Sequence, residues 1–560
     1  MEKKQFKMKT LKYIVLSLLT LSMVACDNEV VEDFRELNDN NDAPLEVLTA
    51  GSVDFSNYVS LGNSLTAGFT DNALFIAGQQ NSFPNILSQK FALVGGGNFN
   101  QPLTNDNVGG LLLGGNPVLN PITGDNLFAP RLVFGGAGPV PLQSINPMAM
   151  STTDFATGYP TGPFNNLGVP GAASFHLIAP GYGSLANFPS AANPYAIRVT
   201  GNTDSTILEL AMAQSPTFFS LWIGNNDVLG YATSGGASGA LTDQATFDFA
   251  YNTLISTLTS QGAKGIVANI PDVTTIPYFT TVPFAPLDPS NEDFAAQIPT
   301  LNGVFGQLNQ VFAFLESQGI PNATDRSIVF SETGASAVVI QDENLMNISA
   351  QITATLNASP TFPTFVESFG LPAAASPIVA NLFGLVYGQA RQANADDLLV
   401  LPSSSIIGEV NEDFAAFLGS QGLPPALAAQ FAAEGVSLPL EDKWVLLPEE
   451  QAEVAAATTS FNATISASAT AAGLAFVDAN ALLTQLANGG IASGDFILNS
   501  GLVTGGAFSL DGVHPNARGY ALIANEFMRA IDATYGSNFE ASGNFVNVGN
   551  YPTNYSPSLE

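Results

Sequence analysis

Residues 217–223 read TFFSLWI, an apolar run that stops at Gly224, and this run is the clearest indication of the architecture of the chain. A continuous apolar run bounded by glycine is typical of a strand buried on both faces of a parallel sheet. Apolar residues then recur at helical spacing between Phe247 and Leu258, and a second apolar strand follows at 265–270. This strand–helix–strand order predicts a parallel sheet flanked by helices, and therefore an α/β fold.

Flanking stretches extend the α/β pattern in both directions. A short strand is predicted at residues 55–61 and another at 474–478. Amphipathic helices, recognised by the helical spacing of their apolar residues, are predicted near 301–315, 450–472 and 520–531. Between about 62 and 165 the chain is rich in Gly, Asn and Pro, which predicts loops and short strands without a long helix.

The composition describes a large, loop-rich globular protein. Of its 560 residues, 46% are hydrophobic and only 11% are charged, and 39 phenylalanines are available for a core. The formal net charge of −32 repels phosphate backbones, so we expect no nucleic-acid partner. We interpret the acidity as a solubility feature of an exported protein. The sequence leaves the oligomeric state open.

The N-terminal segment indicates export. Residues 1–25 begin with several lysines and continue as an apolar run that is too short to span a membrane comfortably, which fits a signal peptide. The only cysteine of the chain, Cys26, closes residues 23–26 (MVAC), which resemble a bacterial lipobox. The resemblance implies that a lipid on Cys26 anchors the protein in the bacterial cell envelope, with the outer membrane expected. Residues 26–50 then form an acidic flexible tether.

A candidate acid–base pair lies near the C-terminus. Residues 510–515 read LDGVHP and contain His514, one of only two histidines in the chain. An imidazole can accept and return a proton near neutral pH. Asp511, three residues earlier, can orient the imidazole and stabilise its charged form if both side chains lie in one tight loop.

Three further loops supply the other groups that acyl transfer needs. Ser64 follows the first predicted strand in residues 62–65 (GNSL), at the strand end where sites form in open α/β sheets. Its hydroxyl needs a base, and His514 is available. Gly171, in a glycine-punctuated loop, and Asn226, after the strand at 217–223, can offer N–H groups to a developing oxyanion.

Together these four loops resemble the four motif blocks of the SGNH/GDSL hydrolase family. The first block, usually Gly-Asp-Ser-Leu, is here GNSL; the second is matched by Gly171, the third by GNND at 224–227, and the last by Asp511 and His514. The resemblance implies a three-layer α/β/α flavodoxin-like sandwich over residues 51–535. Insertions are expected in this domain at about 95–160 and 280–450. A polar tail at 536–560 follows it.

The resemblance also implies a role for each residue. Ser64 would attack an ester carbonyl, His514 would take its proton, and Asp511 would hold the imidazole tautomer. The backbone N–H groups of Ser64 and Gly171, with the Asn226 side chain, would stabilise the oxyanion. The expected enzyme is an ester hydrolase that is similar to esterases and lipases.

The chain departs from the family pattern at Asn63, where the first block usually has aspartate. That side chain is neither nucleophile nor base, so we expect the change to be tolerated. His176, the other histidine, is interpreted as a packed or substrate-side residue and not as the base.

Alternatives differ in substrate and in class. A carbohydrate O-deacetylase on the same fold would act on acylated glycans instead of lipid esters, and a non-catalytic binding lipoprotein would use the fold without chemistry. No cofactor is expected. No metal site is expected either, because two histidines and one lipidated cysteine leave mainly carboxylates and carbonyls as ligands.

Overall fold

A computed structural model describes residues 45–559 of the chain. The predicted signal peptide, Cys26 and most of the predicted tether fall on residues 1–44, outside the described part. The last residues of the tether, 45–50, run beside the C-terminal segment, where the Thr49 backbone N–H donates to Asn538 Oδ1.

A five-stranded sheet forms the centre of the molecule, and all of its strands are parallel. The strands are β1 (Tyr58–Gly62), β6 (Asn166–Gly168), β7 (Phe218–Trp222), β8 (Lys264–Ala268) and β13 (Ala475–Val477). They lie in the order β6-β1-β7-β8-β13. Counted along the chain this is the flavodoxin-like order 2-1-3-4-5, whose ligand sites form at the carboxyl ends of the strands.

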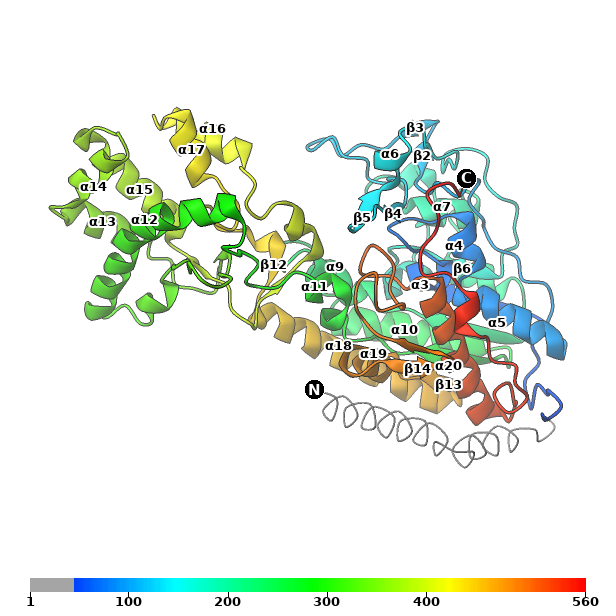
Figure 1. The fold of residues 1–560 in the computed structure, drawn as a ribbon. Helices are drawn as coiled ribbons and strands as arrows, with labels where there is room; N and C mark the ends of the chain where they lie inside the picture. The colour runs from blue at the N-terminus through cyan, green and yellow to red at the C-terminus, as the bar shows by residue number, and fades with distance from the viewer. Residues whose placement is uncertain (1–44, 560) are drawn as a thin grey trace, which may run out of the picture.

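Helices cover both faces of the sheet and complete three layers (Figure 1). On one face α5 (Phe83–Phe91) packs against α20 (Ala517–Tyr535). On the other face α10 (Gln244–Thr259) packs between α8 (Ile207–Met212) and α18 (Pro448–Ala472). The predicted α/β fold with a central parallel sheet is confirmed.

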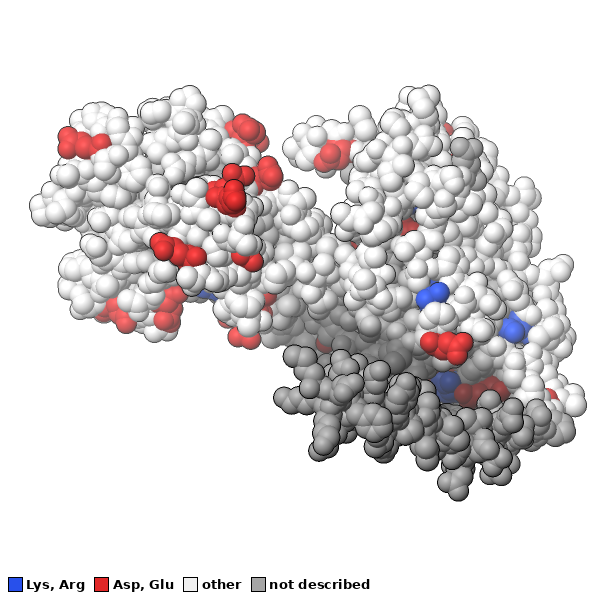
Figure 2. Space-filling model, viewed as in Figure 1, with Lys and Arg blue, Asp and Glu red and all other residues white. Residues whose placement is uncertain are grey.

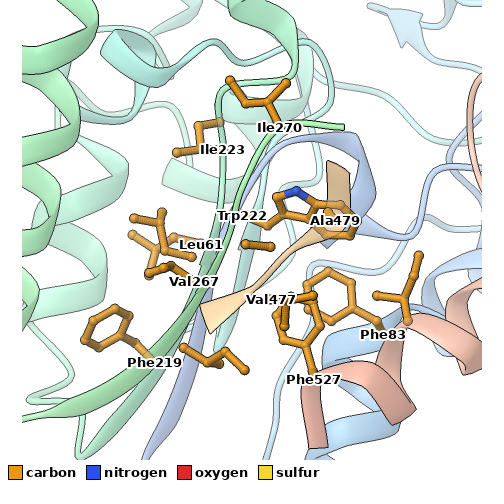
Figure 3. Close-up of a cluster of buried hydrophobic side chains, with 14 of the residues drawn as sticks. Leu61, Phe83, Phe219, Trp222, Ile223, Val267, Ile270, Val477, Ala479 and Phe527 are labelled. Atoms are coloured by element: carbon orange, nitrogen blue, oxygen red, sulfur yellow. The ribbon is translucent and has the colours of Figure 1, made fainter. Parts of the chain in front are cut away.

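Strand β7 shows why the apolar run folds in this way. Successive side chains of a strand point to opposite faces. Trp222 lies toward α5 and α20, with its rings 5.7 Å from Phe83 and 5.9 Å from Phe527, whereas Phe219 lies on the other side of the sheet (Figure 3). Because both faces are covered, the whole of β7 is buried, and an uninterrupted apolar run is required.

The predicted helices near 301–315, 450–472 and 520–531 are present as α12 (Glu292–Ser317), α18 and α20. The prediction of loops and short strands for about 62–165 missed α5, which has nine residues. Pro84 lies in its first turn, where proline is tolerated because the N–H there has no intrahelical partner. Its buried side chains Phe83, Ile86, Leu87 and Phe91 have helical spacing, so the signal was present in the sequence.

The insertion predicted at about 280–450 builds a lobe with its own hydrophobic core, drawn from residues 282–447 (Figure 1). In this lobe α13 (Ser349–Ala358) packs against α15 (Ser376–Tyr387). A two-stranded ladder of β11 (Leu398–Leu399) and β12 (Val445–Leu446) links the two cores: Leu446 belongs to the main core, and Val445 to that of the insertion.

The segment predicted as a polar tail is irregular, and it packs onto the body. Phe539 and Tyr555 are buried, and the Arg131 guanidinium donates to the carbonyl of Ser556 at 2.7 Å. These apolar side chains are widely spaced among polar residues, so no periodic pattern reveals their burial.

The surface carries more acidic than basic groups, as the negative net charge of the chain requires (Figure 2). Acidic groups are scattered over the insertion lobe on the face in view, and basic groups appear there at few points (Figure 2).

Within residues 45–559 no single helix is long and apolar enough to cross a membrane. One pair of helices, 362–368 with 373–387, has the length and composition of a membrane span when taken together, but it is bent by 114°.

Candidate active site

The structure brings Ser64, His514 and Asp511 into one hydrogen-bonded chain. Ser64 Oγ lies 2.9 Å from His514 Nε2, and His514 Nδ1 lies 2.9 Å from Asp511 Oδ2. The serine follows strand β1, whereas the other two residues lie in the loop before α20. Serine, imidazole and carboxylate in this order are the arrangement that activates a hydroxyl for nucleophilic attack.

The local backbone places Ser64 at the first position of a short helix, α3 (Ser64–Ala67). Asn63 caps this helix, since its Oδ1 accepts the N–H of Leu65 at 3.0 Å. Gly62 is required at the end of β1 because an added Cβ would lie 2.2 Å from Thr66 Oγ1 and 2.3 Å from the Trp222 carbonyl. The strand can therefore turn into the helix only where the side chain is absent.

Asp511 is held by a dense set of donors. Its Oδ1 accepts from Ser509 Oγ at 2.9 Å and from the N–H groups of Val513 and His514 at 2.8 Å each, and its Oδ2 also accepts from the Asn72 N–H. Burial by itself raises the pKa of Asp511, but the charge of the adjacent His514 and the hydrogen bonds from His514 and Val513 outweigh burial and lower the pKa to about 2. The carboxylate is thus charged at neutral pH and stabilises an imidazolium.

The loop that carries the pair rests on the root of the insertion. Gly512 has a φ of 73°, a conformation that favours glycine, and its carbonyl accepts the N–H of Tyr278 at 2.9 Å. Leu401 lies on the same side, 3.0 Å from where a Cβ on Gly512 would be. The second lobe therefore buttresses the Asp511–His514 turn.

The predicted oxyanion donors lie on neighbouring loops. Within residues 45–559 the backbone N–H groups of Ser64 and Gly171 donate to no protein acceptor. Asn226 Nδ2 donates to the carbonyl of Ala172 at 2.9 Å, which ties its loop to the Gly171 loop and uses one of its two amide hydrogens. Both backbone donors and one amide hydrogen are thus left for a ligand oxygen.

The residue that departs from the family pattern has a defined bonding role. Asn63 keeps the acceptor that caps α3, and its Nδ2 also donates to Asn225 Oδ1 at 3.0 Å. An aspartate could not donate that second bond. Asp227, the last residue of residues 224–227, is buried and accepts from the N–H and the hydroxyl of Ser174, so it holds two loops together.

His176 lies apart from this chain of bonds, in the 3-10 helix η2 (Ser174–Ile178). Its Nδ1 accepts the Ala173 N–H at 3.0 Å, and its ring stacks on Tyr182 with centroids 4.4 Å apart. Burial lowers the pKa of His176 to about 4, which keeps the ring neutral. These contacts favour the packed role.

Asp71 is a buried carboxyl group that the sequence did not reveal. Its backbone N–H donates to Ser509 Oγ, which donates to Asp511, and its Oδ1 accepts the Leu510 N–H at 3.0 Å. Burial raises the pKa of Asp71 to about 7; the Leu510 hydrogen bond opposes this rise, the nearby Asp511 adds to it, and Arg131 also opposes it. Its part depends on tertiary contacts, so no local motif identifies it.

An apolar cavity of about 110 Å³ opens beside the serine. Its polar lining consists of Ser64, Asn225, Asn226 and His514, and its other side chains are apolar. Ser64 therefore borders both the predicted oxyanion donors and a volume suited to an apolar group.

One cluster among residues 45–559 has the composition of a cation site. Carboxylate oxygens of Glu343, Asp442 and Glu450 lie within 4.8 Å of one another, a donor set that suits calcium or magnesium better than zinc. Burial, with the neighbouring carboxylates, raises the pKa of Glu450 to about 8 and that of Asp442 to about 6. A shared proton can thus relieve the repulsion without a cation.

Comparison of the chain with family models, with curated proteins and with solved structures found no match. The functional argument therefore depends on the fold and on the geometry of the site.

The raised pKa of Asp71 predicts a pH-dependent stability. A carboxyl group whose folded pKa is about 7 instead of 3.8 stabilises the fold at low pH, and this stabilisation is lost as the pH rises from about 4 to 7. Asp71→Asn keeps the oxygen acceptor and suits the φ of 50°. We expect its unfolding midpoint to exceed that of the wild type by an amount that grows between pH 5 and 8. The exposed Asp325→Asn is the charge-matched control, and parallel pH profiles of wild type and Asp71→Asn would contradict the assignment.

Proposed function

We propose that this protein is a serine hydrolase that cleaves carboxylic esters, and that it is an SGNH/GDSL-type hydrolase. One observation carries the proposal: Ser64, His514 and Asp511 are joined by two 2.9 Å contacts at the carboxyl edge of a parallel sheet with flavodoxin-like order. The order of the four loops along the chain supports the same proposal.

The reaction begins with proton transfer. His514 Nε2 takes the proton of Ser64 Oγ as this oxygen attacks the ester carbonyl carbon, and Asp511 stabilises the resulting imidazolium. The tetrahedral intermediate collapses as His514 returns the proton to the leaving alcohol. A water molecule, activated by the same imidazole, then hydrolyses the acyl-serine and releases the acid.

The negative oxygen of the intermediate needs donors that are in place before the reaction. The unpaired N–H groups of Ser64 and Gly171 and the second amide hydrogen of Asn226 serve this role. The bond from Asn226 to Ala172 fixes the amide, so little reorganisation is needed when charge develops.

A non-catalytic binding lipoprotein has no need for this arrangement. Five hydrogen bonds hold Asp511, including one from the imidazole that contacts Ser64, and so precise a placement of the carboxylate favours catalysis.

We also propose that the chain is exported and anchored in the bacterial envelope through a lipid on Cys26, on the basis of residues 1–26.

Removal of the nucleophile or the base tests the enzyme directly. We expect Ser64→Ala and His514→Ala each to lower turnover of p-nitrophenyl acetate by roughly 10⁴-fold, because the members of such a triad act as a unit. Wild type, but not Ser64→Ala, should react covalently with a fluorophosphonate probe. His176→Ala is the control and should retain activity. A folded Ser64→Ala protein that kept its activity would refute the proposal.

The oxyanion assignment predicts a smaller loss at Asn226. Asn226→Ala should lower kcat by about 10²–10³-fold, since it removes one preorganised donor. Asn411→Ala, which removes a bonded amide from the insertion lobe, is the matched control and should leave kcat near that of the wild type. A change in KM alone for Asn226→Ala would assign this amide to substrate binding instead.

The anchor proposal predicts a change of cellular fraction. In cells fed an alkynyl fatty acid, the wild-type protein should carry the label and sediment with membranes. Cys26→Ser should lose the label and leave the membrane fraction. A labelled Cys26→Ser protein would exclude this cysteine as the lipid site.

A further inference from the structure

We propose that the apolar cavity beside Ser64 binds the acyl chain of the substrate, so that the enzyme prefers esters of medium-chain fatty acids to acetyl esters. This inference rests on the proposed function, because it assigns a substrate class to the same serine. It names the group that the cavity receives and the side of the scissile bond on which that group lies.

The cavity lies between the sheet edge and the last two helices of the main body. Trp222, at the end of β7, and Ala479, at the start of α19 (Ala479–Asn488), line it, and both lie on the α20 side of the sheet (Figure 3). The serine and the histidine line it as well. An acyl chain attached to Ser64 therefore has a continuous apolar surface within reach.

The walls away from the sheet edge are wholly apolar. Leu483 and Leu486 project from α19, Leu522 and Ile523 from α20, and Ile491 from the hairpin strand β14 (Ile491–Ser493). The one indole N–H in the lining already donates to the Asn269 carbonyl at 3.0 Å. Such walls offer sugar hydroxyls no hydrogen bonds, and burial of an unpaired hydroxyl is costly. They favour a hydrocarbon chain over a glycan.

The volume sets the expected chain length. An aliphatic cavity of about 150 Å³ accommodates benzene, which has six carbons, so about 110 Å³ suits roughly four or five carbons of a flexible chain that begins at the cavity mouth, as in a hexanoyl group. Each buried methylene contributes about 0.8 kcal/mol, which corresponds to about a fourfold gain in kcat/KM per methylene until the cavity is full.

The order of chemical events assigns the cavity to the acyl group and not to the alcohol. The alcohol must leave before water attacks the acyl-serine, and a group in an apolar recess leaves slowly. The attacking water must also approach His514 through polar surroundings, which the cavity walls away from the sheet edge lack. The acyl group, by contrast, stays on Ser64 through both steps. Its binding energy is then available in both transition states.

Two substrate series test this assignment on the purified protein. With p-nitrophenyl esters, kcat/KM should rise from acetate to hexanoate and then level off at octanoate, whose chain exceeds the cavity. With acetates of increasing alcohol length, it should change little. A flat acyl series, or a rise in the alcohol series alone, overturns the inference while the proposed esterase stands.

A substitution that fills the cavity gives the second test. Leu483→Trp should lower the ratio of octanoate to acetate kcat/KM at least tenfold, because the larger ring occupies the space of the chain. Leu385→Trp, at a position 59% exposed in the insertion lobe, is the matched control and should leave that ratio as in the wild type. An unchanged ratio in a folded Leu483→Trp protein overturns the inference.

A binding measurement separates this inference from catalysis. Trp222 lines the cavity and the chain has two tryptophans, so Trp444→Phe leaves Trp222 as the sole reporter. In Ser64→Ala/Trp444→Phe protein, 6-bromohexanoate should quench Trp222 fluorescence saturably, and bromoacetate should not. Absence of saturable quenching overturns the acyl pocket. Quenching together with an inactive wild type would instead overturn the esterase and retain the pocket as a fatty-acid site.

Discussion

The parallel backbone pairing of β1 with both of its neighbours is the constraint on which the site depends. Gly62 is in register with Gly168 of β6 and with Trp222 of β7. Parallel strands in register end at the same edge of a sheet, so the loops that carry Ser64, Gly171 and Asn226 leave the sheet side by side. A shift of one residue in either strand pairing would move the loop after β6 or β7, with its N–H donor, away from Ser64. It would also turn the side chains of the shifted strand to the opposite face of the sheet.

The fourth loop reaches this edge through packing. Helix α20 packs against β13 and α5. The loop that leads into this helix therefore lies beside the end of β1, where His514 contacts Ser64 although the two residues are 450 positions apart in the chain. The turn is then secured from two sides: Asp71 and Ser509 hold the carboxylate side, and Tyr278 at the root of the insertion holds Gly512. Leu401 of the second lobe also lies beside Gly512, so this lobe contributes to the geometry of a site whose cavity it does not line.

Much of the fold was predictable because burial on both faces of a sheet leaves a plain mark in the sequence. The run at 217–223 and the helical spacing of Phe247 to Leu258 identified β7 and α10. Helix α5 was missed because Pro84 and the surrounding glycine-rich sequence conceal a short amphipathic pattern. The C-terminal segment was predicted only as a polar tail, and its packing was not foreseen, because Phe539 and Tyr555 are too widely spaced to form a pattern, although both are buried.

Local periodicity and short motifs were enough to predict the parallel α/β architecture. They also indicated the chemical groups at the site: one hydroxyl, one imidazole with a nearby carboxylate, and candidate N–H donors. The 2.9 Å distance between Ser64 and His514, the stacking of the His176 ring and the bond from Asp71 to Ser509 beside Asp511 become visible only in the folded molecule. The same holds for the apolar cavity, because α19, α20 and β7 together supply its walls. Contacts between residues so far apart in the chain depend on the packing of the whole core, which no local pattern encodes.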